Sequence, residues 1–382
     1  MATRDSSRKT QSTGHPPDDW LDASRPVRDG EELDLDRLAE YLRRHLPGGT
    51  KVAEGDEREL VVEQFPSGFS NLTYLLRLGE QDLVLRRPPF GNRVKSAHDM
   101  GREHRVLSAL AEIYPLAPRP LLYCDDEDVL GAPFYVMERR HGVILRRRLP
   151  PGLVLDAQTA CKLSETFADR LAELHGLDYA GAGLADLGKP EGYVRRQVEG
   201  WAERYRRART HDWKLLEEVL AWLLAELDAQ EPHLDGAALV HNDYKYDNLV
   251  LDPEDLTRMV AVLDWEMCTL GSPLMDLGNS LAYWVEARDP EPWVANAFGP
   301  THAPGSLTRR QLADRYGQTA GGSDQGLLYA YVFGIFRLAV IGQQIYYRYA
   351  QGLTQDPRFA SLDQMVGLCG EVAARALDRD QV

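Results

Sequence analysis

The chain has 382 residues, 43% of them hydrophobic, and a formal net charge of −15 with an isoelectric point near 5.2. This acidity argues against general binding to nucleic acid, because such binding depends on Lys and Arg side chains that neutralise phosphates. The length and apolar content suffice for one large core or two lobes. The four cysteines are widely spaced and suggest neither a zinc cluster nor a disulfide framework, so we expect reduced thiols and a cytoplasmic protein.

The N-terminal 30 residues have the composition of a disordered tail. They are rich in Ser, Thr, Asp, Arg and Pro. They contain no apolar run as long as that of a signal peptide. We therefore predict disorder over residues 1–30, no export, and a folded region that begins at residue 31.

Residues 60–78 predict a β-hairpin whose turn contains small residues. Gly68 can adopt a positive φ without steric cost, so this turn can bring backbone N–H groups close to a phosphate. The side chains of Ser70 and Asn71 can supply further donors. The turn therefore predicts nucleotide binding by Ser67, Gly68, Ser70 and Asn71.

The next predicted strand, residues 82–86, ends at Arg86 and is followed directly by Arg87. Arg86 and Arg87 would point to opposite faces of the sheet, because side chains alternate along a strand. We favour Arg86 as the residue that binds phosphates bidentately. A helix is predicted over residues 97–110, and Glu103 on this helix would form an ion pair with Arg86 and fix its position.

After a further predicted strand that ends at residue 138, the sequence becomes mostly helical. We place a lobe boundary near residue 140, with an N-lobe over residues 31–140 and a C-lobe over residues 141–382. The most apolar stretch, residues 327–347, is close to membrane-spanning length. It contains Arg337 and two glutamines, so we interpret it as a buried C-lobe helix and expect no membrane association.

Two local clusters of arginine stand out in this acidic chain, at residues 146–148 and 195–209. Arginine pairs bidentately with phosphate, so these clusters would suit a phosphorylated or CoA-like substrate. Solvated helix faces are the alternative interpretation. The sequence does not decide between them.

The most informative segments are HNDYKYDNLV at residues 241–250 and VAVLDWE at residues 260–266. Phosphoryl transfer requires a carboxylate at the attacking hydroxyl and, five residues later, an amide oxygen at Mg²⁺. Asp243 and Asn248 have this interval. Asp264 follows an apolar strand and can hold Mg²⁺, which prefers hard oxygen ligands. The segments predict an ATP-dependent kinase with three catalytic residues, Asp243, Asn248 and Asp264, of which Asn248 and Asp264 bind the metal.

These motifs resemble the aminoglycoside phosphotransferase and choline kinase branch of the protein-kinase-like fold, whose loops read H-x-D-x-x-x-x-N and D-W. Within that branch the chain is most similar to the kinase domain associated with acyl-CoA dehydrogenases. The similar segments are FPSGFSNLTYLLRL, DLVLRRPP, GAPFYVMERRHG, HNDYKYDNLV and VAVLDWEMCTLGSPLMDLG. The resemblance implies an α+β, bilobal protein-kinase-like fold with a small antiparallel-sheet N-lobe and a larger, mostly helical C-lobe.

The resemblance also implies roles for other residues. Arg86 would replace the phosphate-binding Lys of protein kinases, as an Arg does in choline kinases. Asp276 would accept backbone N–H groups of the catalytic loop and hold its shape. The hinge that binds adenine through its main chain would consist of Met137, Glu138 and Arg139.

The family implies phosphorylation of small-molecule hydroxyl groups. From the resemblance and the arginine clusters we favour a hydroxyacyl-CoA or related metabolite as acceptor, and a functional link to an acyl-CoA dehydrogenase. An aminoglycoside is the alternative acceptor, but such a polycation would require an acidic pocket. A non-catalytic nucleotide-binding regulator is a further alternative, against which the presence of Asp243, Asn248 and Asp264 argues. The sequence indicates no oligomeric state.

Overall fold

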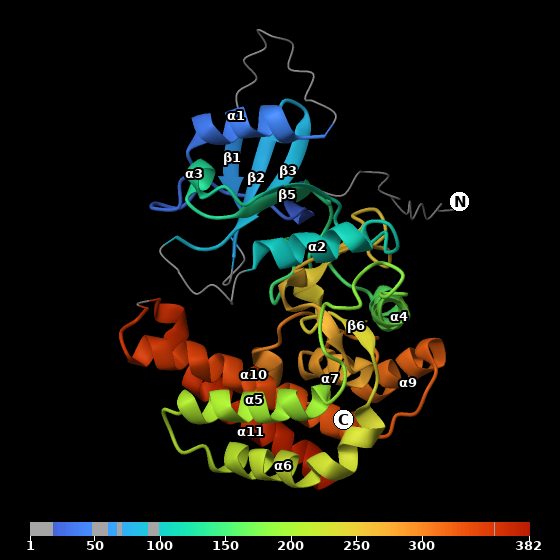
Figure 1. Ribbon diagram of the computed structural model, residues 1–382. Helices are drawn as coiled ribbons and strands as arrows, with labels where there is room; N and C mark the ends of the chain where they lie inside the picture. Colours follow the sequence, from blue (N-terminus) through green and yellow to red (C-terminus); the bar gives the residue numbers. More distant parts are fainter. Residues whose placement is uncertain (1–17, 48–59, 67–70, 91–98, 355) are drawn as a thin grey trace, which may run out of the picture.

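The computed structural model describes residues 18–47, 60–66, 71–90, 99–354 and 356–382. It has a small lobe built on a β-sheet and a larger lobe built mostly of helices (Figure 1). The predicted bilobal α+β architecture is therefore confirmed. The strand-rich part ends at Glu138, close to the boundary that we proposed near residue 140.

The sheet of the small lobe is antiparallel, with the strand order β1-β2-β3-β5-β4. Side chains alternate between its two faces. On one face Leu83 and Leu85 join the core of the small lobe, whereas Val84 and Arg86 point to the other face, towards the larger lobe. The alternation therefore selects which arginine at the end of β3 can reach a site between the lobes. The strands are β1 (Leu60–Gln64), β2 (Leu72–Leu78), β3 (Gln81–Arg87), β4 (Pro120–Cys124) and β5 (Phe134–Glu138).

Two helices cover opposite faces of this sheet, α1 (Leu35–His45) and α2 (Met100–Leu110) (Figure 1). Helix α1 buries Leu38 and Leu42 against the sheet, and each buried leucine contributes about 1.5–3 kcal/mol. Helix α2 was predicted over residues 97–110, but it begins at Met100 with Asp99 as its N-cap, because the Asp99 side chain accepts from the backbone N–H of Arg102. A short helix, α3 (Glu127–Leu130), lies between β4 and β5.

The segment that precedes α1 is ordered, which differs from the disorder predicted for residues 1–30. It contains a short 3-10 helix, η1 (Asp18–Trp20), and a β-bridge between Leu21 and Val143. A second bridge joins Arg25 to Gln64 of β1. The prediction is wrong for residues 18–30 because their backbone groups bond to both lobes despite the polar composition. Residues 1–17 lie outside the described residues.

The larger lobe holds the remaining helices and two small antiparallel sheets, in which β6 pairs with β9 and β7 with β8. These short strands carry the segments with the kinase motifs. The α-helices are α4 (Ala157–His175), α5 (Tyr193–Arg207), α6 (Lys214–Leu234), α7 (Pro273–Ala282), α8 (Glu291–Ala295), α9 (Arg309–Ala320), α10 (Leu327–Ala350) and α11 (Leu362–Arg379). The short strands and 3-10 helices are β6 (Ala238–Val240), η2 (Tyr246–Asn248), β7 (Leu249–Leu251), β8 (Met259–Val262), η3 (Trp265–Met267), β9 (Thr269–Gly271) and η4 (Pro357–Ser361).

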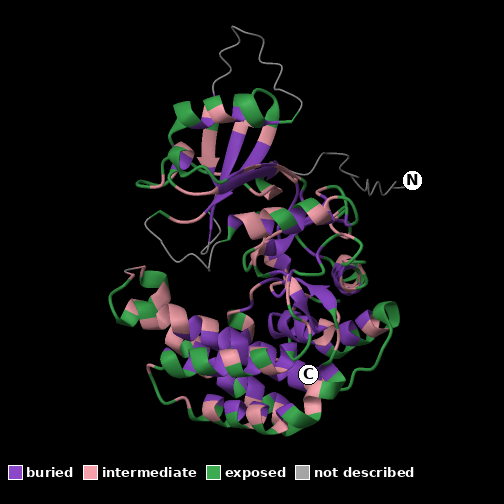
Figure 2. Ribbon diagram, viewed as in Figure 1, coloured by how far each residue is buried: buried purple, intermediate pink, exposed green. Residues whose placement is uncertain are grey.

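Helix α10 is the central helix of this lobe, and Figure 2 shows it largely buried. Its length and apolar composition would suffice to cross a membrane, but two thirds of its most apolar window, 67%, is covered by the rest of the protein. This agrees with the predicted buried helix. It packs backbone to backbone on α7, since a Cβ at Gly278 would lie 2.4 Å from the carbonyl group of Ala330. That close contact fixes α7, which carries Asp276, beside the kinase motifs.

Candidate active site

The hairpin formed by β7 and β8 brings two predicted metal ligands together. Leu249 pairs with Val262, and the backbone N–H of Leu263 donates to the carbonyl oxygen of Asn248 at 2.8 Å. The next residue, Asp264, has a φ of 68° and turns the chain into η3. Non-glycine residues rarely take this left-handed conformation, and they concentrate at functional sites. The local fold therefore presents Asn248 and Asp264 side by side at one end of the hairpin.

Asp243 is held by two neighbouring side chains. Lys245 Nζ donates to both of its carboxylate oxygens, at 3.0 and 2.9 Å. Asn248 Nδ2 donates to the Asp243 carbonyl oxygen and to its Oδ2, each at 2.9 Å. These bonds fix the Asp243 carboxylate. They use the Nδ2 group of Asn248, so the Oδ1 oxygen of the same amide points away from Asp243.

A buried acid on α7 holds the catalytic loop. The two carboxylate oxygens of Asp276 accept the backbone N–H groups of His241 and Asn242, each at 2.7 Å. His175 also contacts this carboxylate, at 3.1 Å. Burial would raise the pKa of Asp276, but the bond from His175 and its charge outweigh burial and lower it, so the group stays ionised. The structural role predicted for Asp276 is confirmed.

His241 is a structural residue of this loop. Its Nδ1 accepts the backbone N–H of Asp243 at 3.2 Å, and its Nε2 donates to the carbonyl oxygen of Leu263 at 3.0 Å. Because burial lowers its pKa, the ring is neutral near pH 7. Its two bonds tie the catalytic loop to the residue before Asp264.

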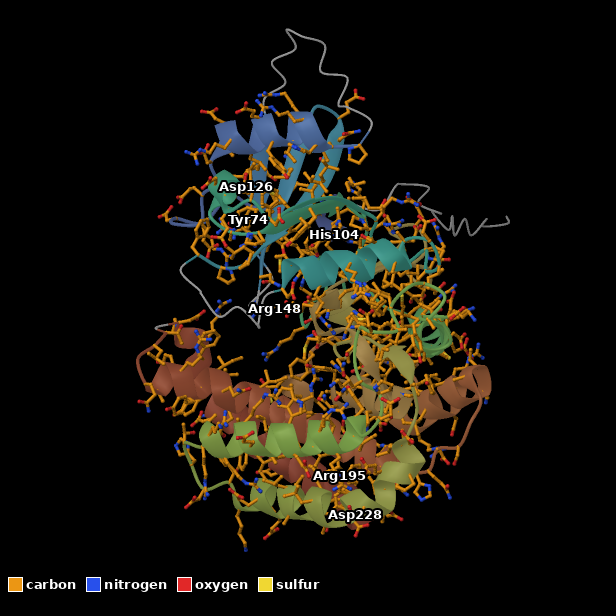
Figure 3. All side chains as sticks on the ribbon, in the orientation of Figure 1. Tyr74, His104, Asp126, Arg148, Arg195 and Asp228 are labelled. Carbon is orange, nitrogen blue, oxygen red and sulfur yellow. The ribbon has the colours of Figure 1, made fainter. Side chains whose placement is uncertain are left out.

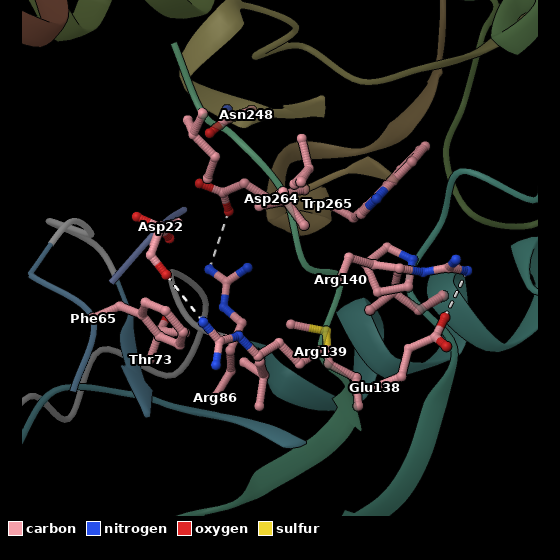
Figure 4. A pocket seen from close by; sticks show the side chains of 18 of the residues that line it. Asp22, Phe65, Thr73, Arg86, Glu138, Arg139, Arg140, Asn248, Asp264 and Trp265 are labelled. Carbon is pink, nitrogen blue, oxygen red and sulfur yellow. Dashed lines mark hydrogen bonds and ion pairs between the residues drawn. The ribbon is translucent and has the colours of Figure 1, made fainter. Parts of the chain in front are cut away.

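Arg86 reaches from the sheet into the space between the lobes. It pairs with Glu103 of α2 at 2.6 Å and with Asp264 at 3.1 Å, as Figure 4 shows for the second contact. Burial would raise the pKa of Asp264, but the charge and hydrogen bond of Arg86 outweigh it and lower the pKa. Arg87 points away and donates to the carbonyl oxygen of Leu130. The predicted ion pair between Arg86 and Glu103 is confirmed, and Arg86 rather than Arg87 lines the cavity between the lobes. Phosphate binding by Arg86 stays a prediction.

A cavity of about 270 Å³ extends from Arg86 to the linker that follows β5 (Figure 4). Val84, Met137 and Leu263 supply apolar walls at the linker end, as suits a planar base. The linker side chains are engaged elsewhere: Arg139 pairs with Asp82 at 2.6 Å, and Glu138 pairs with Arg140 at 2.7 Å. These pairs fix the linker, and its side chains do not need to recognise the base. The cavity is therefore apolar at one end and charged at the other.

Comparison with known proteins shows the family to which the chain belongs. Residues 61–310 match the model of the phosphotransferase enzyme family. The chain belongs to this family. Acyl-CoA dehydrogenase family member 11 of Mus musculus is 35% identical over 328 residues, which cover 84% of the chain and 40% of that protein. Member 10 of the same organism is 37% identical over 268 residues, 70% of the chain and 24% of that protein. The phosphotransferase thus spans well under half the length of these curated relatives.

Solved structures show the same fold. A protein of Ralstonia eutropha, described as a candidate aminoglycoside phosphotransferase, superposes with a TM-score of 0.75 and 28% identity, over 91% of this phosphotransferase and 99% of that chain. Choline kinase of Cryptosporidium parvum has a TM-score of 0.60 at 13% identity, over 91% and 97% of the two chains. The kinase-like fold that the sequence motifs implied is therefore confirmed.

The structure brings most of the predicted site residues of the phosphotransferase to one place. Asp243 adjoins the cavity through its bonds to Lys245 and Asn248. Ser67, Gly68 and Ser70 lie outside the described residues, so their predicted contacts stay predictions, as do the catalytic and metal-binding roles of the others. The predicted residues that line the cavity are Asn71, Arg86, Glu103, Met137, Glu138, Arg139, Asn248 and Asp264.

Two further residues belong to the site, and the sequence analysis missed both. Lys245 lines the cavity and lies 4.7 Å from the centre of the Tyr283 ring. Burial would lower its pKa, but Tyr283 and Asp243 raise it above its ordinary value, so the amine is charged. Glu266 accepts from Asn71 Nδ2 at 2.6 Å, and so joins the two lobes. Each residue follows a motif aspartate by two positions. This position in the sequence is the signal by which both residues could have been predicted.

The arginines of α5 do not gather at the cavity. Arg195 pairs with Asp228 at 2.6 Å and with Glu231 at 2.8 Å, and Figure 3 places this contact far from the small lobe. Arg207 pairs with Glu203 on the same helix. These two arginines therefore agree with the alternative interpretation, in which they lie on a solvated helix face and pair with acids. The structure does not support their contact with substrate.

Glu103→Ala is expected to destabilise the phosphotransferase by about 3 kcal/mol, because it leaves the buried Arg86 guanidinium without its shortest ion pair. The value lies at the lower end for broken buried pairs, since Asp264 continues to contact Arg86. Urea denaturation would measure the loss. The matched control is Glu112→Ala, which removes an exposed partner of Arg119 and should change stability little. Equal losses for the two variants would contradict a stabilising role for the buried pair.

Proposed function

We propose that this chain is an ATP- and Mg²⁺-dependent kinase that transfers the γ-phosphate to a hydroxyl group of a small molecule, with a hydroxyacyl-CoA as the favoured acceptor. The observation that carries the proposal is the convergence of Asp243, Asn248 and Asp264 at the charged end of a cavity whose other end is apolar. Family membership supports the transfer chemistry, and the nucleotide and acceptor are the parts that we add.

Two oxygen atoms of the site fit a Mg²⁺ ion. Asn248 uses its Nδ2 for Asp243, and Asp264 uses its Oδ1 for Arg86, so one oxygen of each remains for a cation. Both are hard oxygen ligands of the kind that Mg²⁺ prefers. A bound Mg²⁺ would supply neutralisation of the phosphate charge.

The protein side chains would then act mainly by alignment and charge. Asp243 would orient the acceptor hydroxyl and accept its proton as the new O–P bond forms, while the bond from the γ-phosphorus to the β,γ-bridging oxygen breaks and ADP leaves. Arg86, positioned by Glu103, would bind the α- and β-phosphates. Lys245, charged and beside Asp243, would stabilise negative charge on the transferred group.

A further buried cation bears on the choice of acceptor. Arg337 of α10 is 3% exposed, donates to the sulfur of Met267 at 3.3 Å, and lies 5.4 Å from the centre of the Trp201 ring. In the part of the chain that the structure describes, it has no ion pair with a carboxylate. Burial raises the pKa of Tyr283 overall, whereas the charges of Lys245 and Arg337 lower it.

A buried cation without a carboxylate partner in the lobe that holds the catalytic loop disfavours a polycationic acceptor. The carbonyl oxygens of an acyl thioester would instead accept hydrogen bonds from a cation such as Lys245, which lines the cavity beside Asp243. This supports a hydroxyacyl-CoA over an aminoglycoside. The curated relatives carry names of the acyl-CoA dehydrogenase family, so we propose a functional link to such an enzyme as well.

The test is ATP consumption, with Mg²⁺, against a panel of hydroxyacyl-CoA thioesters and aminoglycosides. We expect phosphorylation of one or more thioesters and none of the aminoglycosides, with the Asp243→Asn variant as the control for contaminating kinases. Activity with aminoglycosides alone would reject the proposed acceptor. Tight binding of Mg·ATP without any acceptor in the panel would support a nucleotide-binding regulator instead.

A further inference from the structure

The segment that precedes α1 is bonded to both lobes and to the end of the linker between them. On the larger lobe, Trp20 Nε1 donates to the carbonyl oxygen of Pro151 at 3.1 Å. On the small lobe, Arg25 and Gln64 exchange two backbone hydrogen bonds of 2.8 and 2.7 Å. Between these anchors, the backbone N–H of Asp22 donates to the carbonyl oxygen of Gly142 at 3.2 Å. The segment is therefore attached to both lobes and to the end of the linker.

Asp22 is the residue of this segment that enters the cavity. It lines the same space as Arg86 and the linker, and Figure 4 shows it beside Phe65 and Arg139. Its carboxylate lies 2.8 Å from Arg146 Nη1, and its side chain is 21% exposed. Arg139 Nη2 donates to its carbonyl oxygen at 3.1 Å. Contacts to the backbone and the side chain of Asp22 thus hold its carboxylate at the wall of the cavity.

The position of Asp22 restricts what its carboxylate can contact. The apolar linker end suits a base, and the end with Arg86 suits phosphates, so the sugar of a bound nucleotide would lie between them. A carboxylate repels phosphate oxygens, but it accepts hydrogen bonds from the hydroxyl groups of a ribose, as acidic residues do in dinucleotide-binding proteins. Arg146 balances its charge and leaves acceptor capacity, since a carboxylate has about four lone-pair sites.

We propose that Asp22 binds the ribose hydroxyls of the nucleotide, so that the N-terminal segment makes the site selective for ribonucleotides over deoxyribonucleotides. The inference rests on the proposed function, since it requires a nucleotide in this cavity. It assigns a binding role to a segment that the sequence analysis set aside as a tail.

The test is calorimetric titration of the full chain with Mg·ATP and with Mg·2′-deoxy-ATP. We expect the wild-type protein to prefer ATP by about tenfold or more, the scale of a hydrogen bond to a charged group. Asp22→Ala should weaken ATP binding and reduce the preference towards unity. Asp29→Ala, at an exposed position farther along the same segment, should leave both affinities unchanged.

The outcomes separate the inference from the function on which it rests. If the wild-type protein binds neither nucleotide, the proposed function fails and the inference with it. If it binds ATP but does not discriminate against 2′-deoxy-ATP, or if Asp22→Ala keeps the full preference, the inference alone is overturned. Asp22→Ala should remain folded, because the bonds of Arg25 and Trp20 do not involve the substituted side chain. A thermal unfolding transition like that of the wild-type protein would confirm this.

Discussion

Replacing Asp243 with Asn is expected to lower kcat by at least about 100-fold, the usual scale for the loss of a positioned acid or base. An amide cannot accept the proton of the acceptor hydroxyl, although it can still be hydrogen bonded by Lys245 and Asn248. The substitution therefore removes the proton acceptor while it keeps much of the local geometry. Affinity for ATP should change little, because Asp243 adjoins the nucleotide cavity without lining it.

Separate measurements are needed to attribute this loss to chemistry. Single-turnover phosphorylation would report the chemical step, and titration with ATP would report binding. Asp36→Asn, at an exposed position on α1, is the matched control and should leave both quantities unchanged. A variant at position 243 with near-normal kcat would refute the role of Asp243 as proton acceptor. Loss of ATP binding in that variant would instead indicate a structural role.

The features that could be predicted from the sequence depend on short, regular spacings. The interval of five residues between Asp243 and Asn248, and the strand before Asp264, are local properties that the hairpin converts directly into proximity. The same holds for Arg86, since alternation along β3 decides which of two neighbouring arginines faces the larger lobe. Its contact with Glu103 requires only that α2 follows β3 and packs on that face of the sheet.

The features that could not be predicted depend on contacts between distant parts of the chain. Residues 18–30 are polar and have no periodic pattern. Their order comes from backbone bonds to Gln64 and Gly142 and from the bond of the Trp20 side chain to Pro151. Asp22 therefore carried no local signal. The same reason applies to Arg195 of α5, because the acids that pair with it most closely, Asp228 and Glu231, come from α6. Side-chain type alone cannot distinguish a paired surface cation from one that faces a ligand.

Lys245 and Glu266 are a different case, because both stand inside the segments that the sequence analysis singled out. Their positions follow from the same local geometry as those of Asp243 and Asp264, two residues earlier. Both residues would have been predicted as site residues if every charged residue within each motif had been considered together with its defining residues. The fold of this site was therefore more predictable than the set of residues assigned to it.

Asp264→Asn is expected to lower kcat/KM by about 100- to 1000-fold, as the loss of one preorganised electrostatic contact does in other enzymes. Two roles converge on this carboxylate, because it is a candidate metal ligand and it also pairs with Arg86 at 3.1 Å. The two roles predict different dependence on Mg²⁺. If Asp264 binds the metal, the Mg²⁺ concentration for half-maximal activity should rise by at least about tenfold, since even residues that only support a ligand affect metal affinity on that scale.

If Asp264 only positions Arg86, the variant should instead bind ATP more weakly at an unchanged Mg²⁺ requirement. Glu266→Gln is the matched control, because Glu266 also lies near Arg86, at 3.7 Å, but contacts Asn71 rather than the proposed metal-binding oxygens. We expect this control to weaken ATP binding without a shift in the Mg²⁺ requirement. A Mg²⁺ requirement that is the same in the wild-type protein and both variants would exclude Asp264 as a metal ligand and leave Asn248 as the remaining candidate from the catalytic loop.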